Sequence, residues 1–140
     1  MKKNSEWQRH FNEFVESNMN KPFAWGKWDC CIFANACIKS MTGKDVIPKS
    51  LKWKDEKTAM QSIEDYGKTI VKSVAKACKQ AKLKEINKNF VSTGDLVVFQ
   101  GDKTQITGVS DGFKIVAVTE DGFGFADHDK IIKVWRINDV

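Results

Sequence analysis

The sequence predicts an α+β fold in which the helices come first and the strands last. Two observations support this. Apolar residues recur at helical spacing through the first half of the chain, and short β-branched and aromatic stretches follow residue 90. The 140 residues, 41% of them hydrophobic, are enough for one domain with a buried core. We therefore expect a single domain over residues 1–140, helical over about 5–88 and β-sheet over about 93–138.

The two N-terminal helices are predicted from their apolar faces and from their ends. Ser5 and Gln8 have capping-box spacing, so the first helix is expected over 5–18. The second helix is expected from Asp29 to about Met41, with Gly43 as a left-handed stop. Its expected apolar face consists of Cys30, Phe33, Ala34, Cys37, Ile38 and Met41.

Two further helices are expected before the strands. Thr58 is predicted to cap a short helix that ends at Gly67, and a lysine-rich helix is predicted over Val71–Ile86. A stripe of lysines follows one side of the second of these: Lys72, Lys76, Lys79 and Lys82. No aromatic side chains alternate with these lysines to stack on bases, so the stripe predicts a solvated face and no nucleic-acid site.

The C-terminal part reads as an antiparallel meander. The segments "DLVVFQ", "TGVSD", "KIVAVT", "GFGFAD" and "IIKVWRI" are β-branched and aromatic, and Asp-Lys or Asp-Gly turns separate several of them. They predict an antiparallel sheet of about five strands.

Composition limits the partners and the compartment. A net charge of +5 permits an anionic partner without establishing one. No apolar stretch reaches the roughly 18 residues that a membrane span needs, and the start "MKKNSEW" has no apolar run behind its lysines. We therefore expect no membrane partner, and a protein that is made in the cytoplasm without a signal peptide.

The four cysteines are expected to be free thiols. Asp29 suits the helix N-cap, which places Cys30 in the first turn, where the helix dipole favours a thiolate. A reactive Cys30 and a merely packed Cys30 both remain open. Cys31, Cys37 and Cys78 are expected to be core residues, because free cysteine is among the most buried residue types.

Metal and redox chemistry are not expected. Cys30 and Cys31 do not form a C-x-x-C pair, and no other cluster has zinc-ligand spacing. Cys30 and Cys37 would lie two helical turns apart, which is too far for a disulfide. The sequence therefore predicts no metal site and no cofactor.

The stretch "FAWGKWDCCIFANACIKSMTG" resembles the nucleophile region of NlpC-type cell-wall peptidases, which are small papain-like cysteine hydrolases. "TGDLVVF" is similar to the Gly-Asp-Leu-Val strand of that family. The whole chain more closely resembles an uncharacterised branch of the superfamily that occurs in tailed phages and prophages. The motifs shared with that branch are Trp7, Pro22 to Gly26, Asp29-Cys30, Thr42-Gly43, Gly94-Asp95, Gly108 to Gly112 and Trp135 to Ile137. The resemblance implies a papain-like fold, with a curled antiparallel sheet packed on the Cys30 helix.

The resemblance also implies a catalytic arrangement, which the sequence only partly retains. Cys30 matches the nucleophile, and the backbone N–H groups at its helix start match the oxyanion-binding donors. The catalytic histidine position corresponds to Ile106, and the position of the residue that orients it corresponds to Ala117 or Val118. None of these three side chains can accept a proton.

The remaining candidate site residues each have a structural alternative. His10 is expected to be a surface or packing residue of the first helix. His128, between Asp127 and Asp129, is expected in a turn, with a base for Cys30 as the alternative. Trp25 and Trp28 flank the cysteine and are expected either to anchor the core or to wall a substrate groove.

The expected function follows from the resemblance. It is a phage or prophage tail-associated protein with a cysteine hydrolase fold, in which Ile106 replaces the histidine that peptidase activity needs. The alternatives are an active cysteine hydrolase that cleaves peptidoglycan peptides with Cys30, and a non-catalytic protein-binding module. Expected partners are other phage tail proteins and peptidoglycan peptides, and the expected final location is the virion tail.

Overall fold

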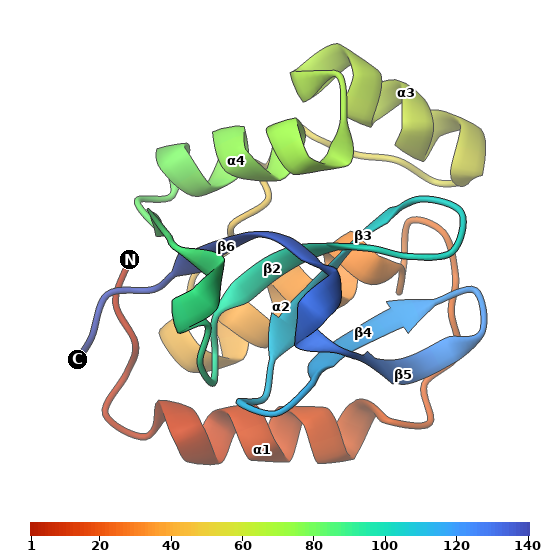
Figure 1. Ribbon diagram of the computed structural model, residues 1–140. Helices are drawn as coiled ribbons and strands as arrows, with labels where there is room; N and C mark the ends of the chain where they lie inside the picture. Colours follow the sequence, from red (N-terminus) through yellow and green to blue (C-terminus); the bar gives the residue numbers. More distant parts are fainter.

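The computed structural model describes residues 1–140 and shows four α-helices followed by a six-stranded antiparallel sheet (Figure 1). The helices are α1 (Trp7–Asn18), α2 (Cys30–Thr42), α3 (Glu56–Gly67) and α4 (Ile70–Gln80). The strands are β1 (Lys84–Ile86), β2 (Leu96–Gln100), β3 (Gln105–Ser110), β4 (Ile115–Thr119), β5 (Gly122–Ala126) and β6 (Ile131–Arg136), in the sheet order β1-β6-β2-β3-β4-β5. The predicted α+β class is confirmed.

The helix α2 packs directly on the sheet. It packs on β3 and β4 and is covered by α1, while α4 packs on β2, β3 and β6 and carries α3 on its outer side. In Figure 1, α1 lies below the sheet, α3 and α4 lie above it, and α2 lies behind it.

The two faces of the sheet bury two separate clusters. The larger cluster joins α2 to the face that carries Val98, Val109 and Val116. The smaller cluster, on the opposite face, contains no helix residue and consists of Val97, Phe99, Ile115, Ala117, Ile131 and Val134. Because successive side chains of a strand point to opposite faces, the neighbouring residues Val97 and Val98 of β2 belong to different clusters.

Helix ends agree with the prediction at α2 and differ at α1. The Asp29 side chain accepts a hydrogen bond from the Ile32 N–H, and Gly43 closes the helix with φ 80°. The predicted capping box at Ser5 is wrong: α1 begins at Trp7, after Glu6, without a side-chain cap. Asn4 takes part in the entry turn instead, because its carbonyl accepts a hydrogen bond from the Trp7 N–H.

The predicted start of α3 is also wrong, because the cap lies three residues earlier than expected. Asp55 is the N-cap, and Thr58 is its capping-box partner inside the helix. The side chain of each residue bonds to the backbone of the other, which satisfies two donors at the helix start. The sequence signal was therefore read on the wrong member of the pair.

The predicted helix Val71–Ile86 is wrong beyond Gln80, where α4 ends. Lys82 adopts a left-handed conformation with φ 64°, and the Leu83 N–H donates to the Cys78 carbonyl at 2.9 Å. This reversal buries Leu83 in the core and turns residues 84–86 into β1, which pairs with β6. The sheet consequently has six strands where about five were expected, and it begins at Lys84 rather than near residue 93. Burial of Leu83 and strand pairing outweigh the helix propensity of the lysine-rich stretch.

Asp95, just before β2, forms an ion pair with Arg136, the last residue of β6, and we call this pair and its partners the Asp95–Arg136 cluster. Asp95 is fully buried and accepts hydrogen bonds from Arg136 Nε and Nη2 at 3.0 and 2.7 Å and from the Ser92 N–H at 2.8 Å. Arg136 also donates to the Phe90 carbonyl and to Ser92 Oγ. The backbone of Asp95 pairs with that of Ser110. The Asp95–Arg136 cluster thus brings together three of the sequence motifs, namely Gly-Asp, "GVSDG" and "WRI".

None of the helices is long and apolar enough to cross a bilayer.

Candidate functional site

The Asp29 side chain holds together the segments that meet at the start of α2. The side chain is buried, and its two oxygens accept hydrogen bonds from the Ile32 N–H at 3.0 Å, the Gly26 N–H at 3.0 Å and Trp53 Nε1 at 2.7 Å. Gly26 has φ 77°, and a Cβ atom there would lie 2.5 Å from the Trp53 carbonyl oxygen. The "WG" and "DC" motifs and Trp53 therefore form one unit that fixes the position of Cys30.

Cys30 and Cys31 form a thiol pair at this helix start. Their Sγ atoms lie 4.0 Å apart, and Cys31 Sγ lies 3.5 Å from Thr107 Oγ1 on β3. Both cysteines are half-buried and free, whereas Cys37 and Cys78 are buried as predicted. The expectation that Cys31 is a core residue is wrong, because its side chain reaches the edge of a cavity and Thr107.

The two thiols of the pair have opposite ionisation tendencies. The pKa of Cys30 is lowered, mainly because the Cys31 thiol donates to its sulfur, and the Thr107 backbone N–H adds a second donor. Burial and the Asp29 charge act in the opposite direction. The pKa of Cys31 is raised well above its usual value, because its proton is held by Cys30 and because burial disfavours its charged form. Cys30 is therefore the more acidic thiol of the pair.

Thr107, and not Ile106, is the β3 residue that faces the thiol pair. Thr107 is buried against Cys31, whereas Ile106 packs against the smaller cluster on the other face of the sheet. The expected third position is split in the same way, with Ala117 in the smaller cluster and Val118 in the larger one. The side chain of Ile106 therefore points away from the thiol pair, and the neighbouring position, which faces Cys31, holds a hydroxyl group.

Neither histidine lies beside the thiol pair. His128 Nε2 lies 3.0 Å from Ser110 Oγ. Ser110 shares the face of Gly108 and Ile115, opposite α2, so β3 itself separates His128 from Cys30. His10 lies near the start of α1, which is tied to the far end of α2 by the hydrogen bond from the Asn4 N–H to the Met41 carbonyl.

Neither tryptophan that flanks the cysteine walls the cavity beside it. Trp28 is a core residue, because it is only 5% exposed and packs edge-on against Phe33. Trp25 is half-buried and packs against Phe23.

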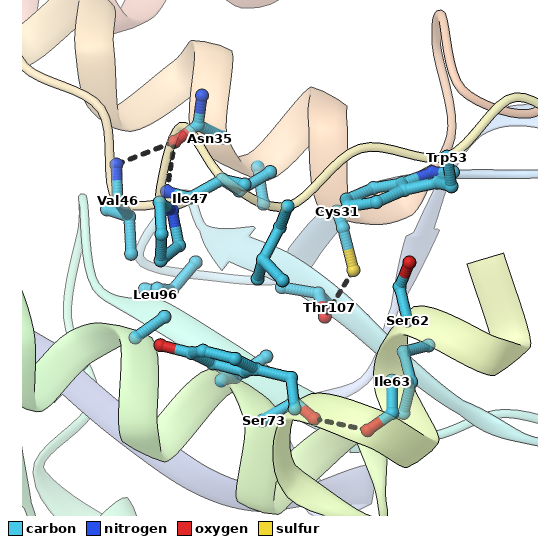
Figure 2. Close-up of a pocket in the computed structure, with 16 residues that line it drawn as sticks. Cys31, Asn35, Val46, Ile47, Trp53, Ser62, Ile63, Ser73, Leu96 and Thr107 are labelled. Carbon is cyan, nitrogen blue, oxygen red and sulfur yellow. Dashed lines mark hydrogen bonds between the residues drawn. The ribbon is translucent and has the colours of Figure 1, made fainter. Parts of the chain in front are cut away.

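A cavity of about 80 Å³ lies on the Cys31 side of the pair, between α2, α3, α4 and the loop that joins α2 to α3. Figure 2 shows Cys31 pointing from α2 toward Thr107 at the wall of this cavity. The aliphatic wall consists of Ala34, Val46, Ile47, Pro48, Leu51, Ile63, Val74, Ala77 and Leu96. The volume exceeds the roughly 10–15 Å³ that one water needs, so the cavity has room for a small group.

Every polar side chain that lines the cavity already has a partner within the protein. Ser62 and Ser73 donate to the carbonyls of Lys52 and Ile63. Asn35 accepts from the N–H groups of Val46 and Ile47, and so ties the loop to α2. The others follow the same rule: Tyr66 bonds to Gln80, Trp53 to Asp29 and Thr107 to Cys31. The cavity therefore presents a mainly apolar surface, and each of its polar side chains is held by a partner within the protein.

Sequence reasoning missed Thr107, Trp53 and Asn35. Thr107 was detectable, since it shares the strand parity of Val109, which faces the Cys30 helix. Trp53 and Asn35 carried no local signal, because their partners lie 24 and at least 10 residues away. No group of three or more His, Cys, Asp or Glu side chains is placed to hold a metal ion.

No curated protein matches the chain. A family profile described as "Domain of unknown function (DUF6950)" matches residues 2–137, which is nearly the whole chain. The helix start at Asp29, the thiol pair and the Asp95–Arg136 cluster all lie within that match, and the protein belongs to this family.

Proposed function

We propose that the protein is a tail-associated component of a tailed phage or prophage, built on a papain-like (NlpC-type) cysteine hydrolase fold and without peptidase activity. The helix that starts with Cys30, whose pKa is lowered, and that packs on an antiparallel sheet supports the relation to these hydrolases. The motif order in the sequence supports the phage context.

One observation carries the lack of peptidase activity. Cys30 Sγ is surrounded by hydrogen-bond donors, namely the Cys31 thiol and the Thr107 N–H, and no imidazole lies beside it. Asp29 is the nearest carboxylate in sequence, and its oxygens are occupied by Gly26, Ile32 and Trp53. Cleavage of an amide needs an acid that protonates the leaving amine, and the site supplies none.

The second candidate function is an active cysteine hydrolase that cleaves peptidoglycan peptides with Cys30 as the nucleophile. The lowered pKa of Cys30 and its place at the positive end of the α2 dipole favour it. A non-catalytic protein-binding module of other origin would have no need for a thiolate at this position.

Peptidoglycan digestion separates the first two candidates. We expect the wild-type protein and the Cys30→Ala variant to leave the same muropeptide profile when each is incubated with purified peptidoglycan and the products are separated by liquid chromatography. New peptide fragments that appear with the wild-type protein and disappear with Cys30→Ala would establish the hydrolase.

Particle composition tests the tail assignment. Phage particles released by cells that carry the gene would be purified on a density gradient and probed with an antibody to the protein. We expect the protein to be present in intact particles and in isolated tails in a constant ratio to the other tail proteins. Its absence from both fractions would contradict the assignment.

A further inference from the structure

The six-stranded sheet is open at both edges. Its edge strands are β5 and β1, and each pairs with a single neighbour, β5 with β4 and β1 with β6 (Figure 1). No backbone hydrogen bond outside the sheet involves residues 122–126 or residues 84–86. In an antiparallel pair, alternate residues direct their N–H and C=O groups away from the partner strand. Both edges therefore offer unpaired backbone groups to a further strand.

The strand β5 has none of the features that commonly prevent an edge strand from pairing. Its sequence, GFGFA, contains no charged residue and no proline. Phe125 is 60% exposed on one face of the strand. On the other face, an added Cβ atom at Gly122 or Gly124 would meet no other part of the chain within 4 Å. A neighbouring strand would thus find an exposed aromatic ring on one side and free space on the other.

The charges beside the two edges have opposite signs. Exposed acidic residues flank β5 on both sides, namely Glu120, Asp121, Asp127 and Asp129. Lys130 and Lys114, which is paired with Asp127, offset part of this charge. Exposed lysines lie on and beside β1, namely Lys82, Lys84 and Lys88. Glu85, the acidic residue of β1, is paired with Lys133. We therefore call β5 the acidic edge and β1 the basic edge.

The strand directions decide how the two edges can meet. All five neighbouring pairs in the sheet are antiparallel, so β1 and β5 run in opposite directions. When a second copy of the chain is shifted sideways along the sheet without being turned over, its β1 lies antiparallel to β5 of the first copy. The sheet then continues from one molecule to the next with the type of pairing that it has throughout.

We propose that this chain associates with further copies of itself head to tail, with the acidic edge of one molecule paired antiparallel with the basic edge of the next. The other two pairings between copies join like charges, because they place the acidic edge against itself or the basic edge against itself. The head-to-tail contact is heterologous, so each addition leaves one edge free for another copy. Neither edge strand contains a residue of the thiol pair or of the cavity, so this association does not depend on the proposed function.

The contact is small, and the association should accordingly be weak. The strand β1 has three residues and β5 has five. A ladder of this length buries less than the roughly 1,600 Å² of a standard stable interface, so we expect dissociation constants of about 0.1–1 mM. Salt should weaken the contact further, because the Debye length falls from about 10 Å at 0.1 M to about 3 Å at 1 M.

Sedimentation velocity of the full chain tests the association. With a reductant present to keep the four cysteines free, the protein would be measured from roughly 0.02 to 1 mM. The average sedimentation coefficient should rise with concentration beyond the value of a dimer, and it should rise less at high salt. A chain that stays monomeric over this range, or that stops at the dimer, would overturn the proposal.

Two variants each make one edge repel its partner. Phe125→Lys adds a positive charge to the acidic edge, where it faces the basic edge, and Lys84→Glu adds a negative charge to the basic edge. Each should weaken self-association about tenfold or more, as expected for one unfavourable charge contact. The matched controls make the same changes of charge at exposed positions outside both edges, and they should associate like the wild-type protein: Met60→Lys on α3 and Lys103→Glu between β2 and β3.

The double variant tests whether these two edges meet each other. In a chain with both Phe125→Lys and Lys84→Glu, each edge again faces the opposite charge on the next copy, so self-association should return. The two positions are about five strand spacings apart in one molecule, roughly 24 Å, so a rescue must come from contact between molecules. Loss of association in both single variants without its return in the double variant would overturn the head-to-tail pairing.

The outcomes for this association and for the proposed function are separate. The variants at the two edges leave Cys30 and its neighbours unchanged, and peptidoglycan digestion does not depend on self-association. A monomeric chain would therefore overturn the pairing of the edges and leave the proposed lack of peptidase activity intact.

Discussion

The two ends of β3 differ in how their polar groups are partnered. At the Ser110 end, the Asp95–Arg136 cluster buries a full negative charge, and each oxygen of Asp95 receives at least one hydrogen bond. At the Thr107 end, a thiol pair borders an apolar cavity and has no charged partner that could take its proton. We call the first the saturated end, because both oxygens of Asp95 have hydrogen-bond partners. We call the second the reactive end, because Cys30, whose pKa is lowered, lies there.

This difference indicates what most of the motifs do. The Gly-Asp, "GVSDG" and "WRI" motifs meet at the saturated end, where Gly94, with φ 89°, packs against the Trp7 ring. Their role there is to hold the sheet to the N-terminal segment. The "WG" and Asp-Cys motifs lie at the reactive end, where Asp29 itself binds the backbone N–H groups of Gly26 and Ile32 and the Trp53 side chain. Because most of the shared motifs make structural contacts, the resemblance is stronger evidence for a common fold than for a common catalytic activity.

Breaking the saturated end should have the largest effect. Arg136→Ala would leave the fully buried Asp95 without its cation, and we expect a loss of about 3–5 kcal/mol in the free energy of unfolding. Urea denaturation followed by circular dichroism measures it. Cys30→Ala, at the reactive end, should cost about 1 kcal/mol or less. Equal losses for the two variants would remove the contrast between the ends.

Adding a base at the reactive end should make Cys30 more reactive. Thr107→His would place an imidazole on the face of β3 that carries the thiol pair, and we expect Cys30 alkylation by iodoacetamide near pH 6.5 to accelerate about tenfold. The rate is read from intact mass against time.

Ile106→His is the matched control for that variant. Its imidazole would enter the smaller cluster on the opposite face of the sheet, so the alkylation rate of Cys30 should not change. Acceleration by Ile106→His and not by Thr107→His would show that the residue facing Cys30 had been assigned wrongly.

Stability should fall as the pH rises above about 8.5, the usual pKa of a cysteine in the unfolded chain. Burial raises the pKa values of Cys37 and Cys78, so both stay protonated in the folded protein while the unfolded chain releases their protons. Each should therefore lower the free energy of unfolding by about 1.4 kcal/mol per pH unit. Urea titrations from pH 7 to about 9.5 give the slope.

Cys78→Ala should make that slope shallower by the contribution of one thiol, whatever it does to the stability at neutral pH. An unchanged slope would mean that the Cys78 thiol ionises equally in both states.

The smallest effect is expected within the thiol pair. Cys31→Ala removes the donor that lowers the Cys30 pKa, so the pH profile of Cys30 alkylation should move to higher pH. Cys31→Ser retains a donor and should move it less. A profile that is the same in both variants and in the wild-type protein would place the cause of Cys30 ionisation elsewhere, at the α2 dipole or the Thr107 N–H.

The sequence alone determined the features that depend on neighbours along the chain. The α+β order, the Asp29 cap, the Gly43 stop and the burial of Cys37 and Cys78 follow from local spacing and from the hydrophobic effect, so they could be predicted. Where two local signals competed, prediction failed. The lysine-rich stretch up to Ile86 has helical composition, and only the burial of Leu83 and the pairing of β1 with β6 end the helix.

Tertiary structure decided the site. A shift of one residue along a strand exchanges its two faces, so only the packing of α2 on β3 could show that Thr107, and not Ile106, faces the thiol pair. The position of His128 behind β3, the cavity beside Cys31 and the bond from Trp53 to Asp29 all join segments far apart in sequence. Contacts of this kind form when packed layers close around a core, and local spacing carries no record of them.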